Sequence, residues 1–130
     1  MIKDIEFPKI KDVKIAIVNE DLSWKVVIIN NSANTLENVL VTSKGYGKDE
    51  NNETITTSTL RHSLGDIKSN ENKEIETIIS EIFHLTNEYW LSYYCENKIY
   101  DKKFIFLPET IKEENLIFIK ELNSKGILHD

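Results

Sequence analysis

The chain has 130 residues, of which 40% are hydrophobic and 29% charged, and its 22 acidic and 16 basic residues give a net charge of −6. This length predicts one domain spanning residues 1–130, large enough to fold without a disulfide or a structural metal. No run is basic enough to neutralise a phosphate backbone or an anionic membrane, so we expect neither nucleic acid nor a membrane among its partners.

Residue usage favours strands over helices. The sequence has 19 isoleucines but only two alanines, and its asparagines cluster between the β-branched runs. β-Branched side chains suit a pleated, half-buried surface, and asparagine tolerates the left-handed backbone of tight turns. We therefore predict an all-β fold, an immunoglobulin-like antiparallel β-sandwich of about seven to nine strands, with at most a short helix near the C-terminus.

Four strands are predicted in the first part of the chain. Residues 2–8 end in a proline and suit an edge strand, because proline cannot donate to a ladder. Residues 13–18 alternate apolar and polar side chains, which predicts the second strand. Residues 24–30 are apolar on both faces and should form a central strand covered on both sides. Residues 37–46 form the fourth.

The middle of the chain is more polar. The threonine-rich segment 54–62 is expected to be an exposed strand near an edge. Residues 63–72 are interpreted as a long connection in which Leu64 and Ile67 tuck under the core. Residues 73–79 alternate charged and apolar positions, as a strand with one wet face does.

The densest aromatic stretch, residues 88–108, is predicted to be the central hairpin, folded back at Glu96, Asn97 and Lys98. Beyond it the tail has two interpretations. One is a short helical turn from Ile111 followed by a strand over residues 116–121; the other is a single helix to Leu122. The run LIFI favours the strand.

No metal site or cofactor is expected. Cys95, His62, His84 and His129 fall in no metal-binding spacing, and His129 is placed at an end expected to fray. Cys95 shares a strand face with Leu91 and so should be buried rather than nucleophilic. The single cysteine and the absence of an uninterrupted apolar run near the N-terminus predict a cytoplasmic protein.

One small surface patch is the candidate site. Sequential strands usually pair, so residues 37–46 and 54–62 should lie side by side and gather Lys44, Tyr46, Arg61 and His62. Arginine and tyrosine are residue types that anchor interfaces. We expect a basic, aromatic binding patch on an otherwise acidic protein.

Five segments of the chain carry a resemblance to known proteins. They are SKGY at 43–46, TSTLRH at 57–62, NKIYDKKFIF at 97–106, the opening KDIEFPKIKDVKIAIVNE and the closing KGIL. These segments resemble a family of short bacterial proteins, many of them labelled "phenylalanyl-tRNA synthetase subunit alpha". The resemblance covers nearly the whole chain and implies a family and a fold. The arginine-bearing motifs that hold ATP in such synthetases are missing, so it implies no synthetase activity.

These observations predict a non-enzymatic protein-interaction or scaffolding module. Its partner is another protein or a second copy, joined through an exposed strand edge. Two alternatives stay open. One is a small-molecule-binding β protein with a pocket lined by Tyr89, Trp90 and Tyr94. The other is a translation-linked accessory protein, suggested by the family label.

Overall fold

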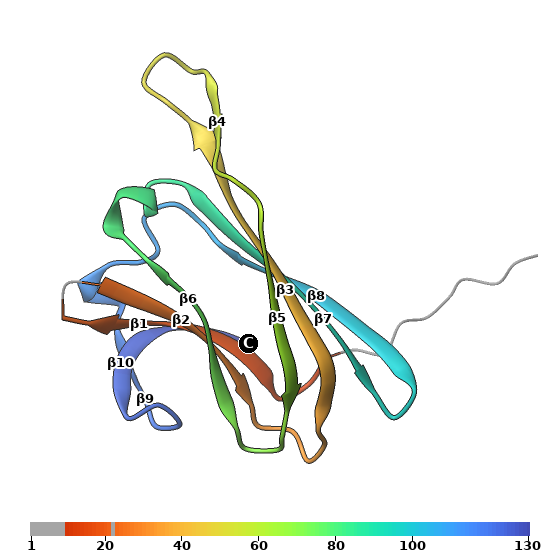
Figure 1. Cartoon of the computed structure of the whole chain (residues 1–130). Coiled ribbons are helices and arrows are strands. Elements are labelled where there is room, and N and C mark those ends of the chain that lie inside the picture. The colour runs from red at the N-terminus through yellow and green to blue at the C-terminus, as the bar shows by residue number, and fades with distance from the viewer. Residues whose placement is uncertain (1–9, 22) are drawn as a thin grey trace, which may run out of the picture.

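Two five-stranded antiparallel sheets face each other in the computed structural model, which describes residues 10–21 and 23–130 (Figure 1). Sheet A has the order β6-β2-β1-β10-β9, and its strands are β1 (Val13–Glu20), β2 (Ser23–Asn30), β6 (Asn72–Ile78), β9 (Ile117–Ile119) and β10 (Ser124–His129). Sheet B has the order β4-β3-β7-β8, with β5 also paired to β3. Its strands are β3 (Leu36–Lys48), β4 (Thr54–Thr56), β5 (Leu60–Ile67), β7 (Thr86–Cys95) and β8 (Lys98–Phe106). Two short 3-10 helices, Ser80–Ile82 and Glu113–Asn115, lie in the connections between the sheets.

The predicted fold class, an immunoglobulin-like antiparallel sandwich, is confirmed. The described residues form ten strands, more than the predicted seven to nine. The threonine-rich segment is divided between β4 and β5, and the tail forms an additional strand, β10, that was not predicted. The Gly45 amide donates to the hydroxyl of Thr57 at 2.7 Å, so a side chain interrupts the ladder between β4 and β5. The prediction of a connection over residues 63–72 is wrong for residues 63–67, because β5 continues to Ile67. Its second part is confirmed, since Ile67 is buried in the core and Leu64 packs against it. The strand predicted over residues 2–8 lies outside the described residues.

The predicted hairpin forms as β7 and β8, but its predicted central position holds for β7 alone. Strand β7 lies between β3 and β8, whereas β8 is an edge strand of sheet B within the described residues. The two-residue turn of the hairpin places Glu96 and Asn97 at φ +50° and +65°, the left-handed conformations that a type I′ turn requires. The predicted inward column is confirmed: every second side chain of β7 is buried against Phe104 and Phe106 of β8. These inward residues of β7 are Tyr89, Leu91, Tyr93 and Cys95.

The tail covers the second face of sheet A. After the 3-10 turn it forms β9, which confirms the strand interpretation, and Ile119 packs on the outward side chains of β1 and β2, among them Val18 and Ile29. Strand β2 is therefore covered on both sides, as predicted. Gly126 permits this approach, since a Cβ there would lie 2.6 Å from the Ile17 carbonyl oxygen.

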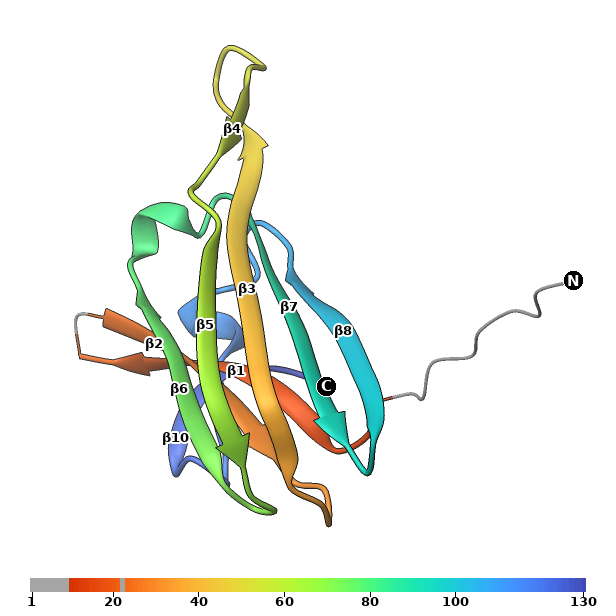
Figure 2. The same cartoon turned by 45° about the vertical axis from the view of Figure 1, so that its right-hand side comes forward.

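Sheets A and B are joined along one side, where β5 and β6 run next to each other before they diverge (Figure 2). The Lys73 ammonium on β6 donates to the backbone carbonyls of Leu64 and Asp66 on β5, at 2.8 and 2.9 Å. This contact satisfies edge carbonyls of β5 and closes the sandwich at that end. No helix in the described part of the chain has the length and apolar content needed to cross a membrane.

Candidate functional site

The four residues of the predicted patch lie on two faces of sheet B. Strands β3 and β5 pair as expected, with Thr42 opposite Arg61 and Val41 opposite His62. Side chains alternate along a strand, so Arg61 points outward with Lys44 and Tyr46, whereas His62 points toward the space between the sheets. The structure therefore brings three of the four residues to one face and separates the fourth from them.

On the outer face, Lys44 and Tyr46 meet at a buried carboxylate. Glu88 on β7 is 7% exposed, and its oxygens lie 3.9 Å from Lys44 Nζ and 3.5 Å from the Tyr46 hydroxyl. Burial, followed by the charge of Glu88 and the hydrogen bond to it, raises the pKa of Tyr46. Lys44 and Tyr46 therefore both contact the Glu88 carboxylate. Arg61 is the second cationic residue of the predicted patch that points outward.

The outer face of sheet B also carries a larger apolar surface that sequence analysis did not identify. Trp90, at the centre of this surface, is 44% exposed, and the Lys103 ammonium lies 4.7 Å from the centroid of the Trp90 ring. The other exposed apolar side chains of this outer face are Leu40, Tyr94, Ile99 and Ile105. We call these five apolar residues the Trp90 face. Side chains of β7 alternate between inward and outward positions, so the residues between those of its predicted buried column could have been identified from the sequence as outward-facing.

The same alternation bears on the predicted aromatic pocket. Tyr89 is 2% exposed and points into the sandwich, whereas Trp90 and Tyr94 point out of it. Side chains on opposite sides of one sheet cannot line the same cavity. A pocket of that composition is therefore excluded for these residues.

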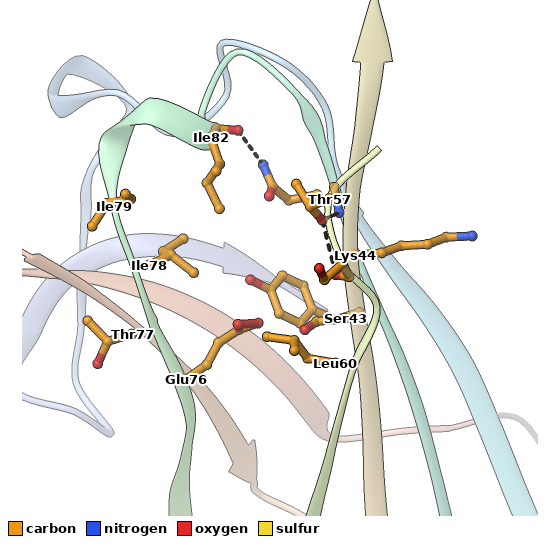
Figure 3. Close-up of a pocket in the computed structure, with 13 residues that line it drawn as sticks. Ser43, Lys44, Thr57, Leu60, Glu76, Thr77, Ile78, Ile79 and Ile82 are labelled. Carbon is orange, nitrogen blue, oxygen red and sulfur yellow. Dashed lines mark hydrogen bonds between the residues drawn. The ribbon is translucent and has the colours of Figure 1, made fainter. Parts of the chain in front are cut away.

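A different cavity opens where β5 and β6 diverge (Figure 3). Its volume is about 340 Å³, within the size range of small-ligand sites. The inward positions of β3 shrink from Val41 to Ser43 and Gly45, which leaves the space between the sheets unfilled at this end. Apolar side chains of Leu60 and Ile79 flank its mouth. We call this cavity the β5–β6 cleft.

Glu76 points into the β5–β6 cleft because of a bulge in β6. Val26 pairs with Glu76 and Val27 pairs with Glu74, so Ile75 is the extra residue and the alternation of β6 is reset there. The prediction of a regular wet face over residues 73–79 is wrong at this point. Figure 3 shows the Glu76 side chain directed from β6 toward the strands of sheet B.

Two polar side chains, His62 and Tyr89, lie against the Glu76 carboxylate, and Ser43 contacts the first of them. The His62 Nε2 lies 3.9 Å from Glu76 Oε1 and 3.5 Å from the Ser43 hydroxyl. Burial, then the charge of Glu76 and a hydrogen bond to it, raises the pKa of Tyr89 far above its ordinary value. The cleft is thus apolar at its walls and negatively charged at its floor.

This cluster does not have the geometry of a Ser–His–carboxylate triad. In a triad the two ring nitrogens have different partners, one the nucleophile and the other the orienting carboxylate. Here one nitrogen of His62 faces both Ser43 and Glu76. The arrangement therefore cannot pass a proton from Ser43 along the ring to Glu76.

The residues considered for metal binding lie apart. The described residues contain no group of three potential metal-ligating side chains. His129 was expected at a frayed end, but it belongs to β10, and its ring packs edge-on against Phe104 at 5.1 Å. Cys95 is buried, as predicted, and burial followed by the charges of Glu96 and Glu37 raises its pKa. A raised pKa disfavours the nucleophilic thiolate.

No family model, curated protein or solved structure matches this chain. The resemblance to the proteins labelled as synthetase subunits therefore stays a prediction, and function has to be argued from the geometry.

Proposed function

We propose that this protein is a non-enzymatic protein-interaction module, and that the Trp90 face binds a second copy of the chain. The observation that carries the proposal is a group of five exposed large apolar side chains on one sheet face. Exposed patches of this kind on small proteins mark interaction sites, and tryptophan and tyrosine are the residue types that anchor them.

The charges around the Trp90 face support a second copy as the occupant. The outward positions of sheet B carry four basic residues, Lys44, Lys48, Arg61 and Lys103, and four acidic residues, Glu37, Asp66, Glu88 and Asp101. The net charge of these positions is zero, although the whole chain carries −6. Two acidic chains approach each other with the least repulsion through a neutral face, and a symmetric dimer requires one patch that complements itself.

A face is a better interface here than the strand edge predicted from sequence. The edge of β5 is occupied by the Lys73 ammonium and by the neighbouring β6. The edge strand β8 carries Lys98, Asp101, Lys102 and Lys103, and such charges oppose pairing between edges.

The test is the oligomeric mass as a function of protein concentration, measured by sedimentation equilibrium. The wild-type chain should form a dimer, and Trp90→Ala should raise its dissociation constant about 30-fold, since anchor residues contribute about 2 kcal/mol or more. Phe118→Ala is the control, because Phe118 is 61% exposed but lies on β9 of the other sheet.

Two results would contradict the proposal. One is a monomeric mass at every concentration, and the other is a Trp90→Ala variant that dimerises as tightly as the wild-type chain. Cytoplasmic location and the translation-linked role implied by the resemblance remain separate predictions, on which this test does not depend.

A further inference from the structure

From the β5–β6 cleft we infer a second binding site, independent of the Trp90 face. We propose that the cleft binds a cationic group on a short apolar stem, an alkylammonium or an alkylguanidinium. A lysine or arginine side chain of another protein and a free organic amine share this chemistry.

The first argument is the state of Glu76. Its side chain is 14% exposed, and within the described residues its ion-pair partner is the His62 ring at 3.9 Å, with no lysine or arginine. A carboxylate removed from water is costly unless a cation or several hydrogen bonds compensate it. A bound cation would supply the charge that this side chain lacks.

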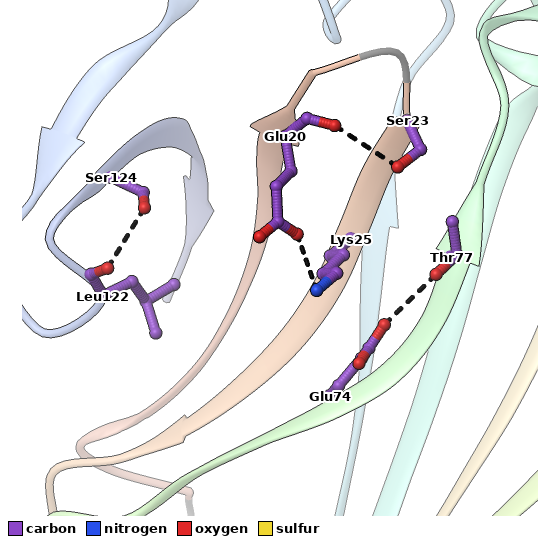
Figure 4. Close-up of polar contacts among 7 residues, drawn as sticks. All are labelled: Glu20, Ser23, Lys25, Glu74, Thr77, Leu122 and Ser124. Carbon is purple, nitrogen blue, oxygen red and sulfur yellow. Dashed lines mark hydrogen bonds and ion pairs between the residues drawn. The ribbon is translucent and has the colours of Figure 1, made fainter.

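The second argument is the position of Glu76 in the fold. A regular ladder would turn this residue to the solvent side of β6, and the bulge at Ile75 turns it inward instead. Bulges are found next to binding sites, where they redirect a single side chain. Glu74, two residues earlier, remains outside and accepts a hydrogen bond from Thr77 at 3.1 Å (Figure 4).

The third argument is the composition of the walls. Leu60 and Ile79 at the mouth are 48% and 56% exposed, and Ile78 and Ile82 continue the apolar wall inward. Methylene groups of a ligand would pack against these side chains while its charged end approached Glu76. Ser43 and Tyr89 also line the cleft, and their hydroxyl oxygens can accept hydrogen bonds from the charged end.

Four probes with short apolar stems, of four carbons or, in butyrate, three, separate charge from apolar contact. n-Butylammonium and n-butylguanidinium carry the cation, 1-butanol is neutral, and butyrate is an anion. Binding is followed by chemical-shift changes of the Glu76, Ile78 and Tyr89 resonances of the full chain. We expect saturable shifts with the two cations only, and weaker binding as salt is added. Equal binding of 1-butanol, binding of butyrate, or no shift with either cation would overturn the proposal.

A matched pair of variants tests the role of the carboxylate. Glu76→Gln keeps the shape of the side chain and should weaken n-butylammonium binding at least tenfold. Glu74→Gln makes the same change on the outside of β6 and should leave binding unchanged. Undiminished binding by a folded Glu76→Gln variant would contradict the proposal. If that variant does not fold, the four probes on the wild-type chain still decide the question.

The source of the cation is distinguished by blocked peptides. A capped lysine or arginine peptide that binds as well as n-butylammonium indicates a side chain of a partner protein. Binding of n-butylammonium without binding of either peptide indicates a free amine. The mass of the protein is measured in the same samples. A monomer that binds cations would refute the proposed dimer and leave the cleft proposal intact.

Discussion

The side-chain amide of Asn30, at the end of β2 in sheet A, donates a hydrogen bond to the backbone carbonyl of Ile67, at the end of β5 in sheet B, over 3.1 Å. Asn30 is fully buried, and its Oδ1 accepts hydrogen bonds from the amide and the hydroxyl of Ser32. One side chain therefore joins the two sheets and also fixes the turn that leads from β2 to β3.

Replacement of Asn30 should destabilise the fold strongly. Asn30→Ala removes the donor and leaves buried polar groups without partners, so we expect the free energy of unfolding to fall by about 2–4 kcal/mol. Asn34→Ala is the control, because Asn34 contributes its backbone carbonyl to this network and its side chain is exposed. Urea denaturation gives both values, and equal stabilities of the two variants would contradict the bridging role.

The contact of Lys73 with β5 gives a second prediction. Lys73→Met keeps the unbranched apolar part of the side chain but removes the ammonium donor from the Leu64 and Asp66 carbonyls. A hydrogen bond from a charged donor contributes about 1.5–3 kcal/mol, and we expect a loss of that size. Lys68→Met, at an exposed position in the adjoining hairpin, should change stability by less than about 0.5 kcal/mol. A loss as small for Lys73→Met as for Lys68→Met would show that the contact stabilises nothing.

The tail gives a third prediction from two residues of one strand. Ile119 is 2% exposed and covers the outer face of β1 and β2, whereas the adjacent Phe118 is 61% exposed. Ile119→Ala should lower the free energy of unfolding by about 2–5 kcal/mol, while Phe118→Ala should lower it by less than about 0.5 kcal/mol. Thermal unfolding monitored by circular dichroism distinguishes them. A larger loss of stability in Phe118→Ala than in Ile119→Ala would show that Phe118, rather than Ile119, holds the tail on the sheet.

The fold could be predicted because its central strands follow simple alternation. The buried column Leu91, Tyr93 and Cys95 has a period of two residues, and a turn at Glu96 and Asn97 follows directly. The separation of Arg61 from His62 follows from the same alternation and could also have been predicted, since consecutive strand residues face opposite sides.

The β5–β6 cleft could not be predicted from the sequence. The inward position of Glu76 depends on a single extra residue in the pairing of β6 with β2, and a shift of one residue reverses every side chain beyond it. The charged and apolar pattern of residues 73–79 is compatible with either register. The contact between the Ser43 hydroxyl and the ring of His62, 19 residues later, likewise depends on the register of β3 and β5.

The carboxylate of Glu121 gives the last prediction, which concerns pH. It accepts a hydrogen bond from the Asn31 side chain over 2.6 Å, and this bond, with the Glu121 backbone amide and the charges of Lys14 and Lys120, lowers the pKa of Glu121 below its ordinary value of 4.5. A carboxyl group with a lowered pKa in the folded chain stabilises the fold above its unfolded pKa, and that contribution is lost as the pH falls through the folded value.

Asn31→Ala should therefore raise the pKa of Glu121 toward 4.5 and make stability less dependent on pH in the acid range. The pKa of Glu121 is measured by NMR titration of its carboxyl carbon. Stability is measured by urea denaturation from about pH 3 to about pH 6, a range that brackets the ordinary pKa values of carboxyl groups. Asn34→Ala is again the control and should leave the pKa of Glu121 unchanged. An unchanged Glu121 pKa in Asn31→Ala would show that the backbone amide and the two lysines, rather than Asn31, lower that pKa.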